Sequence, residues 1–334
     1  MARKAAAAVL FVSASMGLVS ACGSGDVSSD TGGGGAASSS AAGGGGDLTT
    51  VKVGVIPIVD TAPIWLGKSK GFFKEEGLNL EITTTTGGAA AVPGVVSGDF
   101  DIAFGNVVSL MVATDKGLPL KFISNGTTTT GEKPDFSGVV VPKDSPIKTA
   151  ADLAGKTVSV NNLNNIGDTT IRKVVEEAGG DPKGIKFVEV AFPDAPAAVE
   201  RKQVDAAWIL EPFLSAAVGK GARVVSYNYT EFDPSLDIAG YFTKKDTVEG
   251  KKDMVEGFQR AMKKSLEYAQ SNPDEVRDIV GTYTKIDAAG RAKMVLPKFV
   301  PEFNREAATK LGEAAVSYGT LKKAPNLDEL LPNG

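Results

Sequence analysis

The chain has 334 residues, of which 42% are hydrophobic and 23% charged, a composition typical of a globular protein long enough for two domains. A formal net charge of −4 without a basic stripe excludes a nucleic-acid partner. The sequence has no histidine and a single cysteine, Cys22, which excludes internal disulfides, zinc sites built from His and Cys, and Ser-His-Asp triads. No EF-hand-like spacing is present, and we expect neither a metal nor a cofactor.

Residues 1–21 have the layout of a secretory signal peptide. Arg3 and Lys4 precede an apolar run over 5–18, and small residues lead up to Cys22. The sequence VSAC at 19–22 resembles the bacterial lipobox, in which the cysteine is acylated and becomes the first residue of the mature protein. The alternative is an ordinary cleaved signal followed by a chance cysteine. We expect Cys22 to be the lipidation site that holds the protein on the outer face of the cell membrane.

Residues 22–47 are predicted to be the acylated cysteine followed by a flexible tether. The segment consists almost entirely of Gly, Ala, Ser, Thr and Asp, which cannot bury enough apolar area to offset the entropy of ordering. As a random coil, it would span about 25–30 Å on average. The folded part is therefore predicted to begin at Leu48.

From Leu48 onward, short apolar strands alternate with helical patterns. This alternation predicts an α/β fold with mostly parallel sheets. In the first half, the expected strands are 51–56, 78–83, 101–104 and 120–124, and the expected helices are 62–73, 87–97 and 107–116. In the second half, the expected strands are 157–160, 186–190, 205–209 and 223–226, and the expected helices are 167–178, 195–203 and 211–219.

The second half repeats the layout of the first. Residues 97–104 and 201–208 each run from a helix end through a turn and an Asp into an apolar strand, which favours two similar lobes. Extended segments at 136–141 and 238–243 are predicted as crossovers that act as hinges. Residues 247–321 are predicted to be helical, with breaks at Pro273, Gly281, Pro297 and Pro301, and to pack on the first lobe. The expected boundaries are 48–140 plus 243–334 for lobe 1 and 141–242 for lobe 2.

Six motifs in chain order resemble the nitrate/sulfonate/taurine group of ABC-transporter solute-binding proteins, which includes the NMT1/THI5-like pyrimidine binders. They are VIPIVDTAP at 55–63, KGFFKEEG at 70–77, SGDFDIAFG at 97–105, DLAGKT at 152–157, VDAAW at 204–208 and EPF at 211–213. The resemblance implies a type II periplasmic-binding-protein fold, a solute in the interlobe cleft and a membrane permease as partner. It implies an extracytoplasmic binding protein and not an enzyme, and we expect a monomer.

Ligands of open α/β sheets bind at the carboxyl ends of the strands, so the loops there supply the candidate site. The candidates are Asp60, Thr61, Gly87, Gly88, Asn106, Asn125, Asn164, Asn165, Gly167, Asp168, Asp194, Trp208 and Glu211.

Most of these candidates also have a structural alternative. The Gly87-Gly88 pair suits either an anionic ligand group at a helix N-terminus or a tight turn. The asparagines and Asp168 suit either a polar ligand or helix capping, and Asp60 suits either an amino group or a cap. Trp208 is positioned to stack on a flat ligand.

The chain also departs from the sulfonate binders. IPIV at 56–59 and NNLN at 161–164 replace their GYQ-like and GSN-like loops, and none of the expected cleft loops contains Arg or Lys. This composition argues against sulfonate or nitrate and leaves room for an aromatic or heterocyclic solute. The expected ligand is therefore a small organic solute that is sulfonate- or taurine-like, an aromatic acid or pyrimidine-like. Two other functions remain as alternatives. The first is a ligand sensor that works with a membrane receptor, which would use the same fold. The second is an enzyme, but the enzymes that resemble this family depend on a histidine or on a cysteine that carries their cofactor, and the folded part of this chain has neither.

Overall fold

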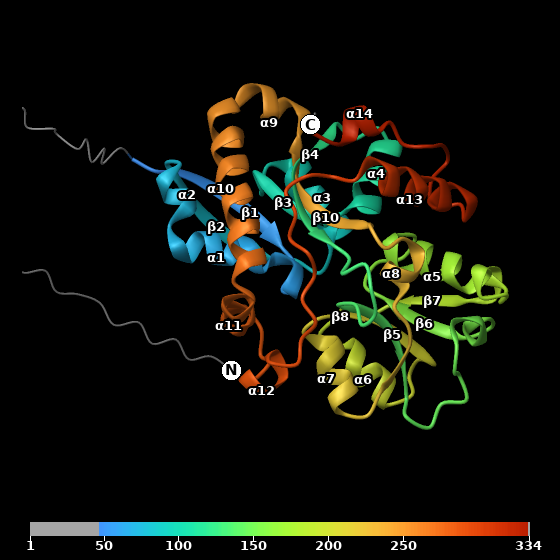
Figure 1. Cartoon of the computed structure of the whole chain (residues 1–334). Coiled ribbons are helices and arrows are strands. Elements are labelled where there is room, and N and C mark those ends of the chain that lie inside the picture. Colours follow the sequence, from blue (N-terminus) through green and yellow to red (C-terminus); the bar gives the residue numbers. More distant parts are fainter. Residues whose placement is uncertain (1–46, 333–334) are drawn as a thin grey trace, which may run out of the picture. The chain divides into compact units, whose positions relative to one another are not determined.

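The computed structural model describes residues 47–332, whose strands form two five-stranded sheets (Figure 1). The first sheet has the order β2-β1-β3-β10-β4: Leu78–Thr84, Thr49–Val55, Ile102–Asn106, Asp237–Lys244 and Leu120–Thr128. The second has the order β7-β6-β8-β5-β9: Lys186–Glu189, Thr157–Val160, Ala206–Leu210, Ser137–Val141 and Arg223–Ser226. Each sheet with its flanking helices is called a lobe, lobe 1 for the first sheet and lobe 2 for the second. The predicted α/β class with two mostly parallel sheets is confirmed.

One antiparallel strand is inserted into each otherwise parallel arrangement. Strand β1 pairs in parallel with β2 and β3, whereas β10 runs antiparallel between β3 and β4. In lobe 2, β6 pairs in parallel with β7 and β8, and β5 runs antiparallel between β8 and β9. Strands β3 and β8 are buried at every residue, as expected for strands covered on both faces.

The segments predicted as hinge crossovers are interior strands of the two sheets. β5 lies in lobe 2 and β10 in lobe 1, and the chain passes between the sheets at residues 129–136 and 227–236. The predicted crossovers differ from the observed strands because an extended apolar segment has the same sequence pattern in a crossover and in a strand inserted into a sheet. The expected boundaries 140/141 and 242/243 therefore fall inside strands. We propose 48–128 with 237–332 as lobe 1 and 137–226 as lobe 2.

The helices of the two sheets follow the predicted alternation, with two differences. Residue Gly71 has a left-handed backbone (φ 82°), so the expected helix over 62–73 divides there into two. The short helix α8 (Asn228–Phe232) was not predicted. The helices are α1 Ala62–Lys70, α2 Phe72–Glu75, α3 Gly88–Ser97 and α4 Val107–Asp115 in lobe 1, and α5 Ile166–Glu177, α6 Ala195–Glu200 and α7 Phe213–Gly219 in lobe 2.

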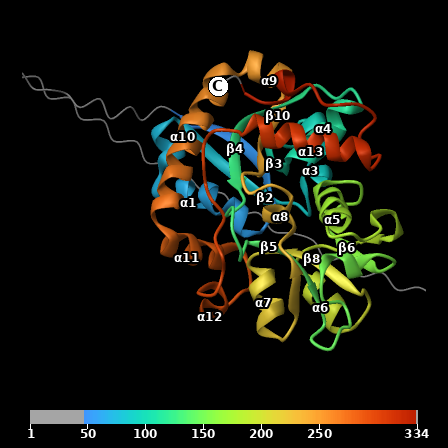
Figure 2. The same cartoon turned by 45° about the vertical axis from the view of Figure 1, so that its right-hand side comes forward.

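The C-terminal region packs on lobe 1, as expected, and it also contacts lobe 2. Helix α13 contacts α4 in lobe 1 and α5 in lobe 2, and α12 contacts α7 (Figure 2). The Tyr318 hydroxyl donates to the Glu176 carboxylate of α5 at 2.7 Å. The expected helix break at Gly281 is wrong, because helix α11 (Pro273–Tyr283) continues past this residue. The elements are α9 Lys245–Gly250, α10 Lys252–Ser271, α11 Pro273–Tyr283, α12 Ala288–Arg291, α13 Arg305–Ser317 and α14 Leu327–Leu330.

Asp135 joins the two crossovers between the sheets. Its side chain is fully buried and accepts hydrogen bonds from the first crossover, including the backbone N–H of Thr130 at 3.2 Å and of Phe136 at 2.8 Å. From the second crossover it accepts the Thr230 backbone N–H at 3.2 Å and the Thr230 hydroxyl at 2.8 Å. A single carboxylate therefore links the two crossover segments to each other.

Asp135→Ala is expected to lower the free energy of unfolding by about 2–4 kcal/mol, because it leaves several buried donors without an acceptor. Urea denaturation monitored by circular dichroism measures this loss. Glu132→Ala is the matched control, since Glu132 lies in the same crossover with an exposed side chain and should change stability by less than about 0.5 kcal/mol. Equal stabilities of the two variants would contradict the role given to Asp135.

The predictions for the signal peptide, for Cys22 and for the tether up to residue 46 lie outside the described residues. Within 47–332, no helix is both long and apolar enough to cross a membrane. The same residues contain no group of three or more acidic or cysteine side chains arranged to hold a metal ion.

Candidate functional site

A small cavity of about 20 Å³ lies between the two lobes, where the carboxyl ends of their parallel strands meet. Lobe 1 contributes residues at the ends of β1, β3 and β10, lobe 2 contributes residues between β6 and the end of β8, and α8 in the second crossover contributes Tyr229. The lining residues are Ile56, Ile58, Asp60, Phe104, Asn106, Asn161, Phe192, Trp208, Leu210, Tyr229, Ile238 and Ala239. Solute sites usually enclose a few hundred Å³, so the lobes have to move apart to admit a ligand.

Among the residues of 47–332 that line the cavity, Asp60 is the only acidic one, and none is Arg or Lys. The residue is 1% exposed, and neither carboxylate oxygen has a hydrogen-bond partner within residues 47–332. Burial, reinforced by the negative charge of Asp135, raises the pKa of Asp60 to about 7. A buried carboxylate without a partner is costly for the protein alone and suits a ligand that brings a positive charge or N–H donors.

Aromatic rings form much of the rest of the lining. Trp208 packs edge-on against Phe192, with ring centroids 5.2 Å apart, and against Tyr229 at 5.6 Å. The indole N–H of Trp208 donates to the Ser137 hydroxyl at 2.7 Å, which fixes the ring orientation. Phe104 contributes a fourth ring from lobe 1. Aromatic faces attract cations and stack on flat heterocycles, so these rings and Asp60 favour the same kind of ligand.

Three of the predicted site residues, Asp60, Asn106 and Trp208, line the cavity. Asn106 has a second role, because its side-chain oxygen accepts the Ser109 backbone N–H at 2.8 Å and caps α4. Gly87 lies nearby at the contact between the lobes, where an added Cβ would meet Asn161 and Asn162 of lobe 2. The remaining predicted residues do not line the cavity.

In lobe 1, three predicted residues stabilise local structure. The Thr61 hydroxyl donates to the carbonyl oxygens of Ile56 and Ile58 in the turn before α1. Gly88 lets α3 approach β3, because an added Cβ would lie 2.6 Å from the Gly105 Cα. The Asn125 amide donates to the Asp237 carboxylate at 3.2 Å and to the Glu302 carbonyl at 2.8 Å. We leave these three out of the proposed site.

In lobe 2, the asparagine-rich loop mainly builds the start of α5. Asn165 is the N-cap, and Asp168 accepts the backbone N–H groups of Asn164 and Asn165 in a capping box. Burial raises the pKa of Asp168 despite these hydrogen bonds. Asn164 is exposed, and Gly167 packs against the Trp208 ring, where an added Cβ would lie 2.5 Å from ring carbons.

The other two acidic candidates lie outside the cavity. Asp194 is exposed at the start of α6 and forms no capping hydrogen bond. Glu211 is buried and accepts the Ser215 hydroxyl at 2.7 Å and the Val295 backbone N–H at 3.2 Å, so it joins lobe 2 to the C-terminal region. Burial raises the pKa of Glu211 to about 7.

Four aromatic or polar residues that the sequence analysis did not single out also line the site: Phe104, Asn161, Phe192 and Tyr229. Phe104, Asn161 and Phe192 lie in or beside the loops at strand ends, so their position in the sequence could have identified them as candidates. Tyr229 lies on α8, which has five residues and no clear periodicity, and only the three-dimensional structure places it here.

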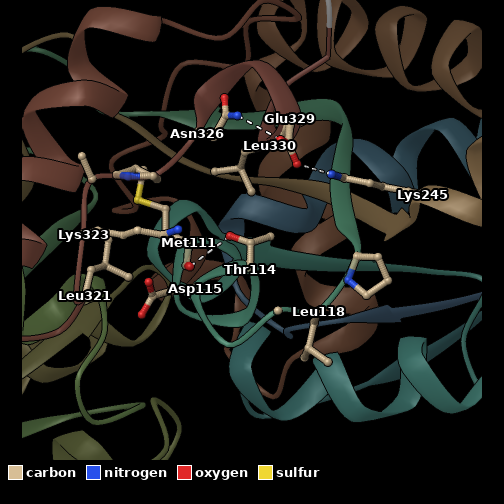
Figure 3. Close-up of a pocket in the computed structure, with 14 residues that line it drawn as sticks. Met111, Thr114, Asp115, Leu118, Lys245, Leu321, Lys323, Asn326, Glu329 and Leu330 are labelled. Atoms are coloured by element: carbon tan, nitrogen blue, oxygen red, sulfur yellow. Dashed lines mark hydrogen bonds and ion pairs between the residues drawn. The ribbon is translucent and has the colours of Figure 1, made fainter.

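A second, roomier cavity of about 350 Å³ lies at the opposite end of lobe 1, between the end of α4 and the C-terminal segment (Figure 3). Buried Met111, Leu321 and Leu330 are among its lining residues, and Lys245, which also lines it, pairs with Glu329 at 2.6 Å. None of the buried side-chain atoms that lack a partner in the described part of the chain belongs to it. Because its polar groups already have partners or face solvent, we place the candidate site between the lobes.

Comparison with solved structures supports the fold. The alkanesulfonate-binding protein SsuA from Xanthomonas axonopodis pv. citri superposes with a TM-score of 0.73 at 15% identity, covering 86% of this chain and 100% of that protein. The ligand-binding component of an ABC-type import system from Staphylococcus aureus, solved with zinc bound, gives a TM-score of 0.74 at 13% identity, covering 85% and 97%. These likenesses confirm the predicted periplasmic-binding-protein fold.

Sequence comparison identifies the family. The formylaminopyrimidine-binding protein of Halalkalibacterium halodurans is 22% identical over 224 residues, which is 66% of this chain and 65%, slightly less than two thirds, of that relative. The family model described as "NMT1/THI5 like" matches residues 58–276, which include Asp60, Trp208 and every strand from β2 to β10. The chain therefore belongs to the NMT1/THI5-like family.

Proposed function

We propose that this chain is the solute-binding component of an ABC importer and that it captures a small aromatic solute carrying a positive charge or amino groups. The observation that carries the proposal is the buried Asp60 carboxylate, which has no hydrogen-bond partner among the described residues and lies in a cavity lined by aromatic rings. A cationic or amino-substituted ring would satisfy the carboxylate and stack on Trp208 at the same time. Membership in a family with pyrimidine-binding relatives supports the same ligand class.

Closure of the lobes couples binding to transport in this proposal. The lobes already meet through direct hydrogen bonds, such as Val59 N–H to the Glu211 carbonyl at 3.0 Å. A ligand that contacts both lobes stabilises a closed arrangement, with enough space between the lobes to hold it, over an open one by its differential affinity. The permease would then recognise the closed form. Acylated Cys22 and the tether would hold the monomeric protein on the extracytoplasmic face of the membrane.

A thermal-shift panel tests the ligand class. A bound ligand at 100 times its dissociation constant stabilises the folded protein by about 2.7 kcal/mol, which shifts the melting temperature by several degrees. Aminopyrimidines are expected to give this shift, whereas nitrate, taurine, aliphatic sulfonates and aromatic carboxylates are not. Stabilisation by a sulfonate, with none by an aminopyrimidine, would contradict the proposal.

A further inference from the structure

Asn162 of lobe 2 reaches across the contact between the lobes. It follows β6, its side chain is 7% exposed, and its amide oxygen is buried without a hydrogen-bond partner within residues 47–332. The oxygen lies against Gly87 of lobe 1, where an added Cβ would be only 2.1 Å away. A side chain at residue 87 would therefore force the Asn162 side chain to move before the lobes could meet in this way.

Gly87 is the N-cap of α3, a helix of ten residues that begins at Gly88, so the Asn162 oxygen lies beside the amino end of this helix. Its N-cap residue, Gly87, makes no side-chain capping hydrogen bond, and the first N–H groups of a helix lack partners within it. They carry partial positive charge, which attracts the partially negative amide oxygen. Neighbouring contacts hold the loop in place, since the Asn161 amide donates to the Thr86 carbonyl at 3.3 Å and the Asn165 amide donates to the Ser109 hydroxyl at 3.1 Å.

We propose that Asn162 occupies the position at the amino end of α3 where an anionic group would otherwise be held, and that it thereby excludes anionic solutes from the closed cleft. The inference deepens the proposed function and rests on it. An anion would have to displace the Asn162 amide and would then share the cleft with the Asp60 carboxylate, with no basic side chain in the cavity lining. Selectivity here arises from a group that blocks the wrong ligand.

The first test uses calorimetric titration of full-length wild type, Asn162→Ala and the control Leu163→Ala, an exposed neighbour in the same loop. The probes are methanesulfonate and an aminomethyl-substituted aminopyrimidine. Asn162→Ala is expected to bind methanesulfonate at least tenfold more tightly than wild type, and Leu163→Ala is expected to match wild type. A methanesulfonate affinity of folded Asn162→Ala equal to that of wild type would overturn the inference. Failure of wild type to bind the pyrimidine would instead contradict the proposed function.

The second test uses the steric side of the same contact. Gly87→Ala is expected to weaken pyrimidine binding at least tenfold, because its Cβ collides with the Asn162 oxygen as the lobes close. Adding Asn162→Ala to this variant should recover most of the lost affinity, which separates the collision from a folding defect. Unchanged pyrimidine affinity in Gly87→Ala, or no recovery in the double variant, would show that the contact is not part of the bound state.

Discussion

Asp60→Asn is expected to weaken binding of a cationic aminopyrimidine about 100-fold, equivalent to about 2.7 kcal/mol, because it removes the only acidic group lining the cavity. The same change is expected to stabilise the ligand-free protein at pH 8 by about 1–3 kcal/mol, since a neutral amide avoids the cost of a buried charge without a partner. Titration calorimetry and urea denaturation measure the two effects. Loss of stability together with unchanged affinity would contradict the role given to Asp60.

The pH dependence follows from the direction of the pKa shift. Burial raises the pKa of Asp60 from 3.8 to about 7, so between these values the folded protein binds more protons than the unfolded chain. The stability of the ligand-free protein therefore falls as the pH rises from about 4 to 7, and Asp60 accounts for at most about 4 kcal/mol of this fall. Glu211, whose pKa is also raised to about 7, contributes in the same direction. Cation affinity should change oppositely and decline below pH 7 as Asp60 becomes protonated.

Trp208→Phe is expected to weaken pyrimidine binding about tenfold, because the smaller ring stacks less well and cannot donate to Ser137. The chain has only two tryptophans, which makes a fluorescence test specific. Trp65 stacks on Tyr283 with ring centroids 5.0 Å apart and does not line the cavity. The ligand-induced fluorescence change should therefore vanish in Trp208→Phe and persist in Trp65→Phe. Persistence of the signal in Trp208→Phe would place the ligand elsewhere.

The arrangement of strands and helices was largely predictable, because buried strands and amphipathic helices leave strong local patterns. The strand at 157–160 was predicted with the bounds that β6 has, and most other bounds differ by only a few residues. The insertion of β5 and β10 into the sheets was not predictable. Hydrophobic periodicity says that a segment is extended, but it does not give the direction of the strand or the sheet that it joins.

The site was predictable only in part, because capping and ligand binding require the same polar residues. Asn165 and Asp168 have the three-residue spacing of a capping box, and in the structure they form one. Asp60 had the same ambiguity, but its carboxylate has no capping hydrogen bond and lies in the cavity. The contact between Gly87 and Asn162 joins residues that are distant in the sequence and in different lobes, so no local pattern could reveal it.

The most direct test is titration of the purified protein at pH 8 with an aminomethylpyrimidine and with a pyrimidine carboxylate of the same size. The two compounds share ring stacking and differ in the sign of the charge that would meet Asp60. We expect the aminomethyl compound to bind at least 100-fold more tightly than the carboxylate, with Asp60→Asn abolishing most of this difference. Tighter binding of the carboxylate by the wild-type protein would contradict a cleft built for cationic aromatic solutes.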